Sequence, residues 1–301
     1  MAFSASEAAV EGFRIARREP RTILGWSLFQ LVFAIAMTAA TLPFMRPLAA
    51  LQSLQTPGAR PTTAQLSAVL EPVLGFLGAV IPLELVLFSV LGAAVFRAVL
   101  RPHEKGLARL KLGGDELRMA ILWIELGFLL WVVGAVVMVS VAIVASVIVT
   151  VLKAPIGEGL VTAAICYLAV LAVMVWLSVR LSLAAPLTFA TRKVQLFAAW
   201  KLTRGRFWPL FGCYLLSFIF MAIVMFAMLS VVALVALALS GGSMPLAAKS
   251  LGDPDYASFA AYLTPVRIIQ LLLNALAGGL YWGVAFAPAA VAYREFGNAP
   301  A

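Results

Sequence analysis

The chain has 301 residues, of which 63% are hydrophobic and only 12% are charged, and its formal net charge is +9. Soluble domains are roughly half apolar and about a quarter charged, so this composition excludes a soluble globular protein. Cys166 and Cys213 both lie inside long apolar stretches, which argues against a disulfide framework and a metal site. We therefore expect no metal and no cofactor.

Six apolar stretches follow one another along the chain, and each reaches the ~20 residues that a helix needs to cross the hydrocarbon of a bilayer. Their predicted ranges are 23–45, 68–98, 117–152, 158–185, 207–240 and 264–293. We predict an all-α integral membrane protein with six transmembrane helices and amphipathic cytoplasmic helices. Residues 1–22 would form a cytoplasmic amphipathic helix and residues 23–301 the membrane domain, whose short loops leave no room for a soluble catalytic domain.

The lysines and arginines are distributed unevenly between the two sides that these spans define. Segments on the side of the termini hold 17 of the 22, which leaves 5 on the opposite side. By the positive-inside rule, this asymmetry places the N- and C-termini in the cytoplasm of a multi-pass protein of the bacterial inner membrane. The positive charge then faces anionic head groups, so we expect membrane lipids as partners and no nucleic acid.

Two basic segments predict a membrane-surface basic face. Residues 4–21 have arginines at helical spacing, while Val10, Phe13 and Ala16 fall on another face, as in a helix that lies on a membrane surface. A second basic segment leads into the fifth span, where Gly205 would allow a turn. The cations of the two segments are Arg14, Arg17, Arg18, Arg21, Lys201, Arg204 and Arg206.

These two segments also resemble each other in sequence. Residues 13–17 match 200–204, and residues 95–97 at the end of the second span match 292–294 at the end of the sixth. Both copies enter the membrane from the same side, so a duplication would be a weak parallel repeat. Alternatively, any basic lead-in to a span has this pattern, and both interpretations stay open.

Enzymatic chemistry finds little support in the sequence. His103 is the only histidine and lies in a loop, which excludes a HExxH metalloprotease and a histidine-based nucleophile dyad. Residues 113–117 resemble the start of the diguanylate cyclase signature, but we interpret them as a helix start with Asp115 as N-cap and Glu116 in the first turn. We expect a non-enzymatic protein without catalytic residues.

Three ionisable residues inside the predicted spans form a candidate buried polar site: Glu84, Glu125 and Arg180. Glu84 lies 13 residues before Arg97 and hence near the bilayer centre, where a carboxylate costs ~2.5–3.5 kcal/mol on insertion scales. It is either a proton or ligand site or a neutral, hydrogen-bonded packing group beside Pro82. Glu125 and Arg180 could pair with each other, or Arg180 could extend its head group to the interface.

Residues 180–216 carry a resemblance to a known family. They include Arg-Leu-Ser-Leu-Ala-Ala-Pro at 180–186 and Ala-Ala-Trp-Lys-Leu-Thr-Arg-Gly-Arg-Phe-Trp at 198–208. This pattern resembles bacterial six-span proteins similar to the membrane domain of glycerophosphoryl diester phosphodiesterases, without the catalytic domain. The Ala-Tyr-Arg at 292–294 also fits. The resemblance implies a structural joint between the fourth and fifth spans and assigns no catalytic role.

We therefore expect a non-enzymatic membrane protein that organises lipid or a partner membrane protein, with its basic face against anionic head groups. Each lysine or arginine near the surface would contribute about 1 kcal/mol. The alternative is a small transporter or permease subunit with Glu84 in its pathway. A lipid-processing enzyme is a third, less favoured reading, since the sequence offers no evident general base or metal ligands.

Overall fold

The computed structural model describes residues 3–52, 63–104, 106–152, 156–252 and 255–297. These residues form helices and no strand. Six of the helices are long and apolar enough to cross a membrane, which confirms the predicted all-α, six-span fold of a multi-pass membrane protein. They are α3 (Pro20–Gln52), α4 (Thr63–Leu100), α5 (Gly114–Leu152), α6 (Ile156–Leu181), α9 (Phe207–Leu239) and α12 (Pro265–Gly297).

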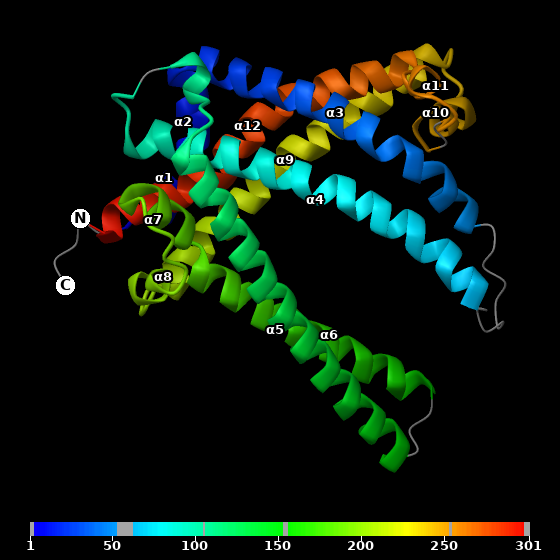
Figure 1. The fold of residues 1–301 in the computed structure, drawn as a ribbon, viewed down its shortest axis with the longest axis horizontal. Coiled ribbons are helices and arrows are strands. Elements are labelled where there is room, and N and C mark those ends of the chain that lie inside the picture. Colours follow the sequence, from blue (N-terminus) through cyan, green and yellow to red (C-terminus); the bar gives the residue numbers. More distant parts are fainter. Residues whose placement is uncertain (1–2, 53–62, 105, 153–155, 253–254, 298–301) are drawn as a thin grey trace.

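Shorter helices connect these spans and gather at the two ends of the bundle (Figure 1). Near the two termini lie α1 (Ala5–Ala9), α2 (Glu11–Arg18), the 3-10 turn η1 (Leu107–Arg109), α7 (Ala184–Thr191) and α8 (Ala198–Leu202). At the opposite end lie α10 (Met244–Gly252) and α11 (Phe259–Tyr262). The rings of Phe3 and Phe296 lie 4.9 Å apart. The chain therefore begins and ends on the same side of the bundle, as an even number of spans requires.

Helix α12 is the centre of the bundle and packs closely on α2 and α3. A Cβ atom on Gly279 would come within 2.4 Å of Ser27 Oγ, and one on Gly12 within 2.5 Å of the Val284 backbone nitrogen. Small residues at such crossings let helix backbones approach each other within a membrane. Ser27 Oγ also donates to the Leu276 carbonyl at 3.2 Å across the α3–α12 contact.

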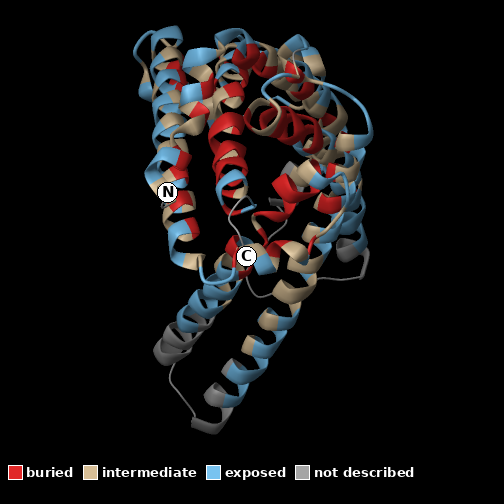
Figure 2. Ribbon diagram, turned by 90° about the vertical axis from the view of Figure 1, so that its left-hand side faces the viewer, coloured by how far each residue is buried: buried red, intermediate tan, exposed pale blue. Residues whose placement is uncertain are grey.

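Burial is uneven along the spans. Figure 2 shows buried residues concentrated in the bundle near the termini, whereas the antiparallel pair α5 and α6 projects away from it and is largely exposed. Phe128, Trp131 and Tyr167 on this pair are each at least 65% exposed. In a bilayer these side chains face lipid. The core instead centres on Trp26 and Phe96, both fully buried.

The amphipathic helix predicted over residues 4–21 is divided into α1 and α2, which meet at Val10. Its apolar face does not lie free for lipid, because Gly12 packs on α12 and Phe13 packs edge-on against Phe220 of α9 at 5.6 Å. The pattern of residues identified an amphipathic segment but could not show that protein, and not the membrane, covers its apolar side.

The fourth apolar stretch contains a break that the sequence did not predict. Helix α6 stops at Leu181, Ser182 and Leu183 make a turn, and the buried helix α7 follows. Apolar residues continue through this break because α7 packs into the core near Phe96, so hydropathy alone does not reveal it. At the start of the fifth span Gly205 has φ 74°, the left-handed conformation that glycine adopts most readily, which confirms the predicted turn.

Candidate functional site

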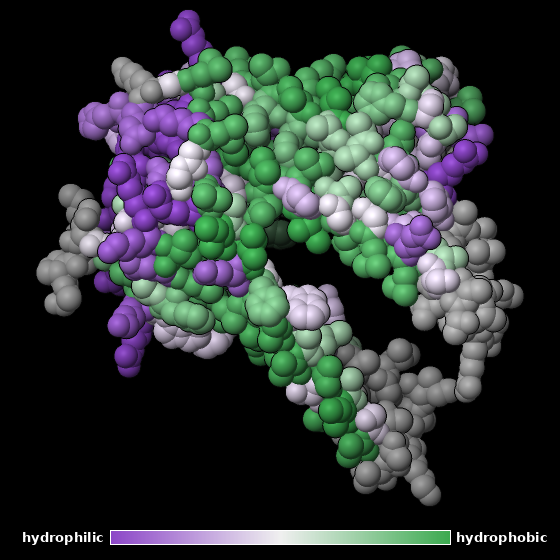
Figure 3. All heavy atoms as spheres, viewed as in Figure 1, coloured by the Kyte–Doolittle hydropathy of each residue, from purple (hydrophilic) through white to green (hydrophobic). Residues whose placement is uncertain are grey.

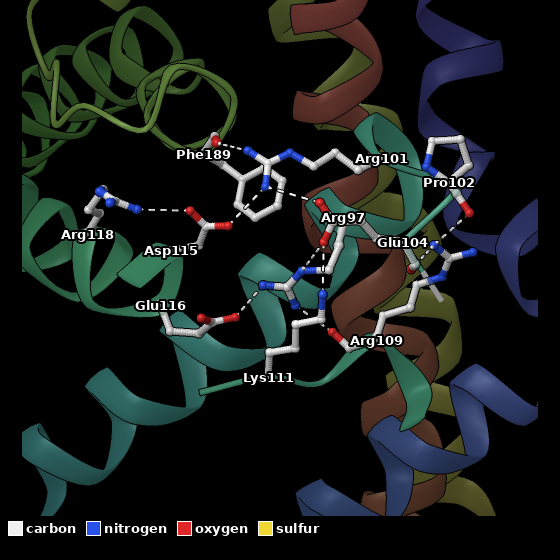
Figure 4. A network of polar contacts seen from close by, with 10 residues as sticks. All are labelled: Arg97, Arg101, Pro102, Glu104, Arg109, Lys111, Asp115, Glu116, Arg118 and Phe189. Atoms are coloured by element: carbon white, nitrogen blue, oxygen red, sulfur yellow. Dashed lines mark hydrogen bonds and ion pairs between the residues drawn. The ribbon is translucent and has the colours of Figure 1, made fainter. Parts of the chain in front are cut away.

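The charged residues gather at the end of the bundle where the chain begins and ends, and we call this the basic end. Figure 3 shows most hydrophilic side chains there, with hydrophobic side chains over most of the body and a smaller hydrophilic group at the opposite end. The loop between α4 and α5 lies at the basic end (Figure 1), and together with the adjoining helix ends it forms a polar cluster that we call the arginine network (Figure 4). Its members are Arg97, Arg101, Glu104, Arg109, Lys111, Asp115, Glu116 and Arg118.

Arg97 is the buried centre of the arginine network. Its side chain is only 1% exposed in the last turn of α4, and it donates to the Glu116 carboxylate in the first turn of α5. It also donates to the carbonyl oxygen of Arg109, and its Nε lies 3.7 Å from the Glu104 carboxylate. A buried charge of this kind persists only with paired and hydrogen-bonded surroundings. The ion pair between Arg97 and Glu116 therefore fastens α4 to α5.

Arg101 lies one helical turn after Arg97 and extends the network to α7. It donates to Asp115 at 3.0 Å and to the carbonyl oxygen of Phe189 at 2.9 Å. Its guanidinium lies 4.4 Å from the centre of the Phe189 ring, within the range of a cation–π contact. Asp115 accepts a second hydrogen bond from Arg118 at 3.0 Å. Three helices thus meet through one arginine.

Arg109 connects the same loop to the start of α3. Its Nε and Nη2 donate to the two carboxylate oxygens of Glu19 at 3.1 and 2.7 Å, the paired geometry that arginine forms with a carboxylate. Trp26 donates from Nε1 to the carbonyl oxygen of Ala108 at 2.8 Å. Ala108 and Arg109 both have positive φ angles, 50° and 58°. These contacts hold the loop in a conformation that is rare for residues with side chains.

Glu104 connects the buried and exposed parts of the network. Lys111 donates to its carboxylate at 3.0 Å, and Arg101 lies 3.5 Å from it. The hydrogen bond from Lys111, together with the nearby positive charges of Lys111, Arg101 and Arg97, holds the pKa of Glu104 below its ordinary value. Glu104 therefore stays ionised well into the acid range.

An open pocket of about 370 Å³ lies over the network, and we call it the basic pocket. Five cations line it, against three carboxylates, which leaves an excess of two positive charges. Arg192 is among the five, and no ion pair or hydrogen bond of its side chain occurs among the described residues. It ends α7 with φ 56°, again in the left-handed region. Such a pocket attracts anions, and arginine suits phosphate and carboxylate groups in particular.

The structure distributes the sequence-predicted polar residues over three places. Glu84 is half-buried in α4, away from the arginine network, and Glu125 is exposed on α5. Among the described residues no ion pair joins Glu125 to Arg180. Arg180 donates instead to the carbonyl oxygen of Thr203 at 3.0 Å, and Thr203 Oγ1 donates back to the Arg180 carbonyl at 2.9 Å. Arg180 also lies 5.5 Å from the Trp200 ring. Arg180 thus belongs to a joint between α6 and α8.

The predicted basic face is largely exposed at the basic end. Of its seven cations, all except Arg206 are exposed, and Arg206 lies 4.3 Å over the Phe296 ring. Sequence reasoning did not find the arginine network, because it treated Arg97 and Arg101 only as topology-setting charges. The signal was present: two arginines one turn apart close α4, and two acidic residues open α5. Asp115 lies inside the first turn, not at the predicted N-cap, since α5 begins at Gly114.

In comparisons with known proteins, no family model, no curated protein and no solved structure matches this chain. The resemblance to the phosphodiesterase membrane domain therefore remains a sequence-based prediction. Its two motif stretches lie at the turn from α6 to α7 and at the entry from α8 into α9.

Proposed function

We propose that the protein is a non-enzymatic membrane protein that organises lipids by holding anionic head groups at its basic end. In this proposal the protein spans a bacterial inner membrane, and its basic end lies on the cytoplasmic side. The observation that carries it is the basic pocket, whose excess positive charge lies at the end of an apolar bundle. Anionic head groups are abundant at the cytoplasmic surface of the bilayer, and basic residues near that surface attract them.

The charge pattern within the pocket supports this assignment. Each carboxylate is already engaged: Glu116 with Arg97, Asp115 with Arg101 and Arg118, and Glu104 chiefly with Lys111. Lys111 and Arg118 are also 47% and 36% exposed, so both remain accessible to a ligand. A phosphate group would therefore meet accessible cations whose backbone positions are set by the network. It would not have to break the buried pair of Arg97.

The network also explains why we propose binding and not turnover. Its ion pairs and hydrogen bonds fasten the start of α3, α4, α5 and α7 together, which preorganises the pocket. Preorganisation of this kind lowers the cost of binding a ligand. The exposed arginines of α2 and Lys201 of α8 lie at the same end and extend the anion-attracting surface.

Native mass spectrometry with defined lipids tests the proposal. We expect the purified protein to retain phosphatidylglycerol more strongly than phosphatidylcholine of the same chain length. The double variant Lys111→Ala/Arg192→Ala should lower phosphatidylglycerol affinity roughly 30-fold, given about 1 kcal/mol for each cation. The matched control is Arg46→Ala/Lys249→Ala, which removes two exposed cations from other parts of the chain. Equal retention of the two lipids, or equal losses in the two double variants, would refute the proposal.

A further inference from the structure

Two apolar cavities lie side by side within the bundle, and the arginine network does not include them. The inner cavity, of about 300 Å³, is lined by side chains of α4, α5, α6, α7, α9 and α12. The outer groove, of about 470 Å³, lies between α6 and α9. Ser178, Ser182 and Tyr214 line both spaces. The two spaces are thus neighbouring parts of one site. We call the three residues that they share the waist of this site.

The outer groove opens toward the membrane. Leu215 and Phe218 form part of its wall and are 47% and 63% exposed, and Ser178 at the waist is also exposed. A molecule from the surrounding bilayer can therefore reach the waist without crossing the charged end of the protein.

The inner cavity has an unsatisfied hydrogen-bond donor in its wall. Trp123 lines it, and the Nε1 of Trp123 is buried with no hydrogen-bond partner among the described residues. An indole N–H can only donate, and a buried tryptophan usually finds an acceptor. Leaving such a group unpaired within a membrane costs several kcal/mol. A ligand that brings an acceptor oxygen into this apolar cavity would therefore satisfy the indole N–H.

The depth of the cavity identifies the chemistry of that acceptor. Phe96, which lines the inner cavity, is adjacent to Arg97, and Trp123 lies seven residues after Glu116. At 1.5 Å per residue, Trp123 is about 10 Å below the charged end of α5. The ester carbonyls of a glycerolipid lie directly beneath its head group, and its acyl chains continue toward the bilayer centre. The outer groove continues past the depth of Trp123, because Phe218 in its wall lies 11 residues, or about 16 Å, beyond the start of α9 at Phe207.

We propose that the inner cavity and outer groove together bind one acyl chain of an ester-linked lipid, whose ester carbonyl accepts a hydrogen bond from Trp123. The head group is not specified by this site, so the inference goes beyond the proposed function and does not depend on the head group being anionic. The ester oxygen is the feature that the site distinguishes.

Lipids that differ only in linkage test the inference. The full-length protein, purified in mild detergent, is titrated with diester and diether phosphatidylglycerol of equal chain length and followed by native mass spectrometry. We expect the wild type to prefer the diester about two- to tenfold, the range of one net hydrogen bond. Trp123→Phe keeps an aromatic ring without the donor, so it should bind both lipids equally, with the diether affinity unchanged.

A second variant keeps the inference testable if Trp123→Phe folds poorly. Ser178→Phe fills the exposed waist, and we expect it to reduce binding of both lipids at least tenfold. Its matched control is Ser140→Phe on the exposed surface of α5. Equal binding of diester and diether by the wild type, or equal lipid retention by the two serine variants, would overturn the inference. A lost preference for anionic head groups with an intact ester preference would contradict only the proposed function.

Discussion

At the scale of single residues, Arg97 shows how far a charge can differ from its sequence-based interpretation. The positive-inside pattern treats it as one of 17 cations on the side of the termini, facing anionic head groups. The structure instead buries its side chain between Glu116 and the carbonyl oxygen of Arg109. Removing one member of such a pair leaves the other buried and unpaired, and that penalty exceeds the net contribution of the intact pair.

Replacing Arg97 should therefore destabilise the protein strongly. We expect Arg97→Met to cost about 3–5 kcal/mol, because the Glu116 carboxyl group would remain buried without its partner. The double variant Arg97→Met/Glu116→Leu should recover most of that loss. Unfolding in mild detergent, followed by circular dichroism, measures both. Arg17→Met is the control at an exposed arginine, and an equally small effect at both positions would contradict a structural role for the buried pair.

Glu104 predicts a pH dependence of stability. Its pKa is lowered in the folded protein, so its contribution is present above the ordinary value of 4.5 and is lost as the pH falls through the lower, folded pKa. We expect Glu104→Gln to unfold at a lower temperature than the wild type at pH 7. Below about pH 4.5 the difference should shrink, because the wild-type carboxylate also becomes neutral. A difference that is constant from pH 7 to pH 3 would show that the charge of Glu104 is unimportant.

At the scale of elements, the segment between the fourth and fifth spans is held by specific side-chain hydrogen bonds and a glycine turn. Helix α6 stops at Leu181, and Thr203 and Arg180 exchange two hydrogen bonds that fix α8 beside it. Gly205 then turns the chain into α9 with φ 74°. The polar side chains of this joint replace the backbone hydrogen bonds that a continuous helix would supply.

A side chain at Gly205 should weaken this joint. Gly205→Val places a β-branched residue at positive φ, which costs about 1–3 kcal/mol. Gly212→Val is the matched control, because Gly212 lies within α9 and a Cβ atom there has no neighbour within 4 Å. We expect the folded yield and unfolding temperature to fall for Gly205→Val only. Equal behaviour of the two variants would show that the joint tolerates other turns.

At the scale of the whole molecule, α12 holds the bundle together while α5 and α6 remain largely exposed (Figure 1, Figure 2). Charged residues are concentrated where the chain begins and ends, and the apolar body separates them from the loops at the opposite end (Figure 3). This polarity predicts one orientation in the membrane, because translocating the basic end would carry most of the positive charge across the bilayer.

Cysteine labelling in intact cells tests that orientation. In a background with Cys166 and Cys213 replaced by alanine, we expect a membrane-impermeant thiol reagent to modify Ser250→Cys and not His103→Cys. Both positions lie outside the hydrocarbon-spanning helices, so accessibility depends on the side of the membrane. Permeabilised cells provide the control, in which both variants should react. Labelling of His103→Cys alone in intact cells would reverse the orientation.

The sequence by itself determined the number of spans and their approximate limits, because the length of an apolar stretch reports directly on the thickness of the bilayer. It also identified the turn at Gly205 and the start of α5. These features depend on neighbouring residues, so a local pattern contains the necessary information. The motif residues within 180–216 lie at the turn after α6 and at Gly205, while the family resemblance itself stays a sequence-based prediction.

Only the tertiary structure decided which polar residues meet. Arg109 and Glu19 are 90 positions apart, and Arg101 meets the carbonyl oxygen of Phe189 across 88. Glu125 and Arg180 could pair on sequence grounds, but Arg180 instead donates to the carbonyl oxygen of Thr203. The orientation and crossing angles of the helices select these partners. Close packing at small residues such as Gly12 and Gly279 sets those angles. That packing depends on shape across the whole bundle, for which hydropathy and charge spacing carry no signal.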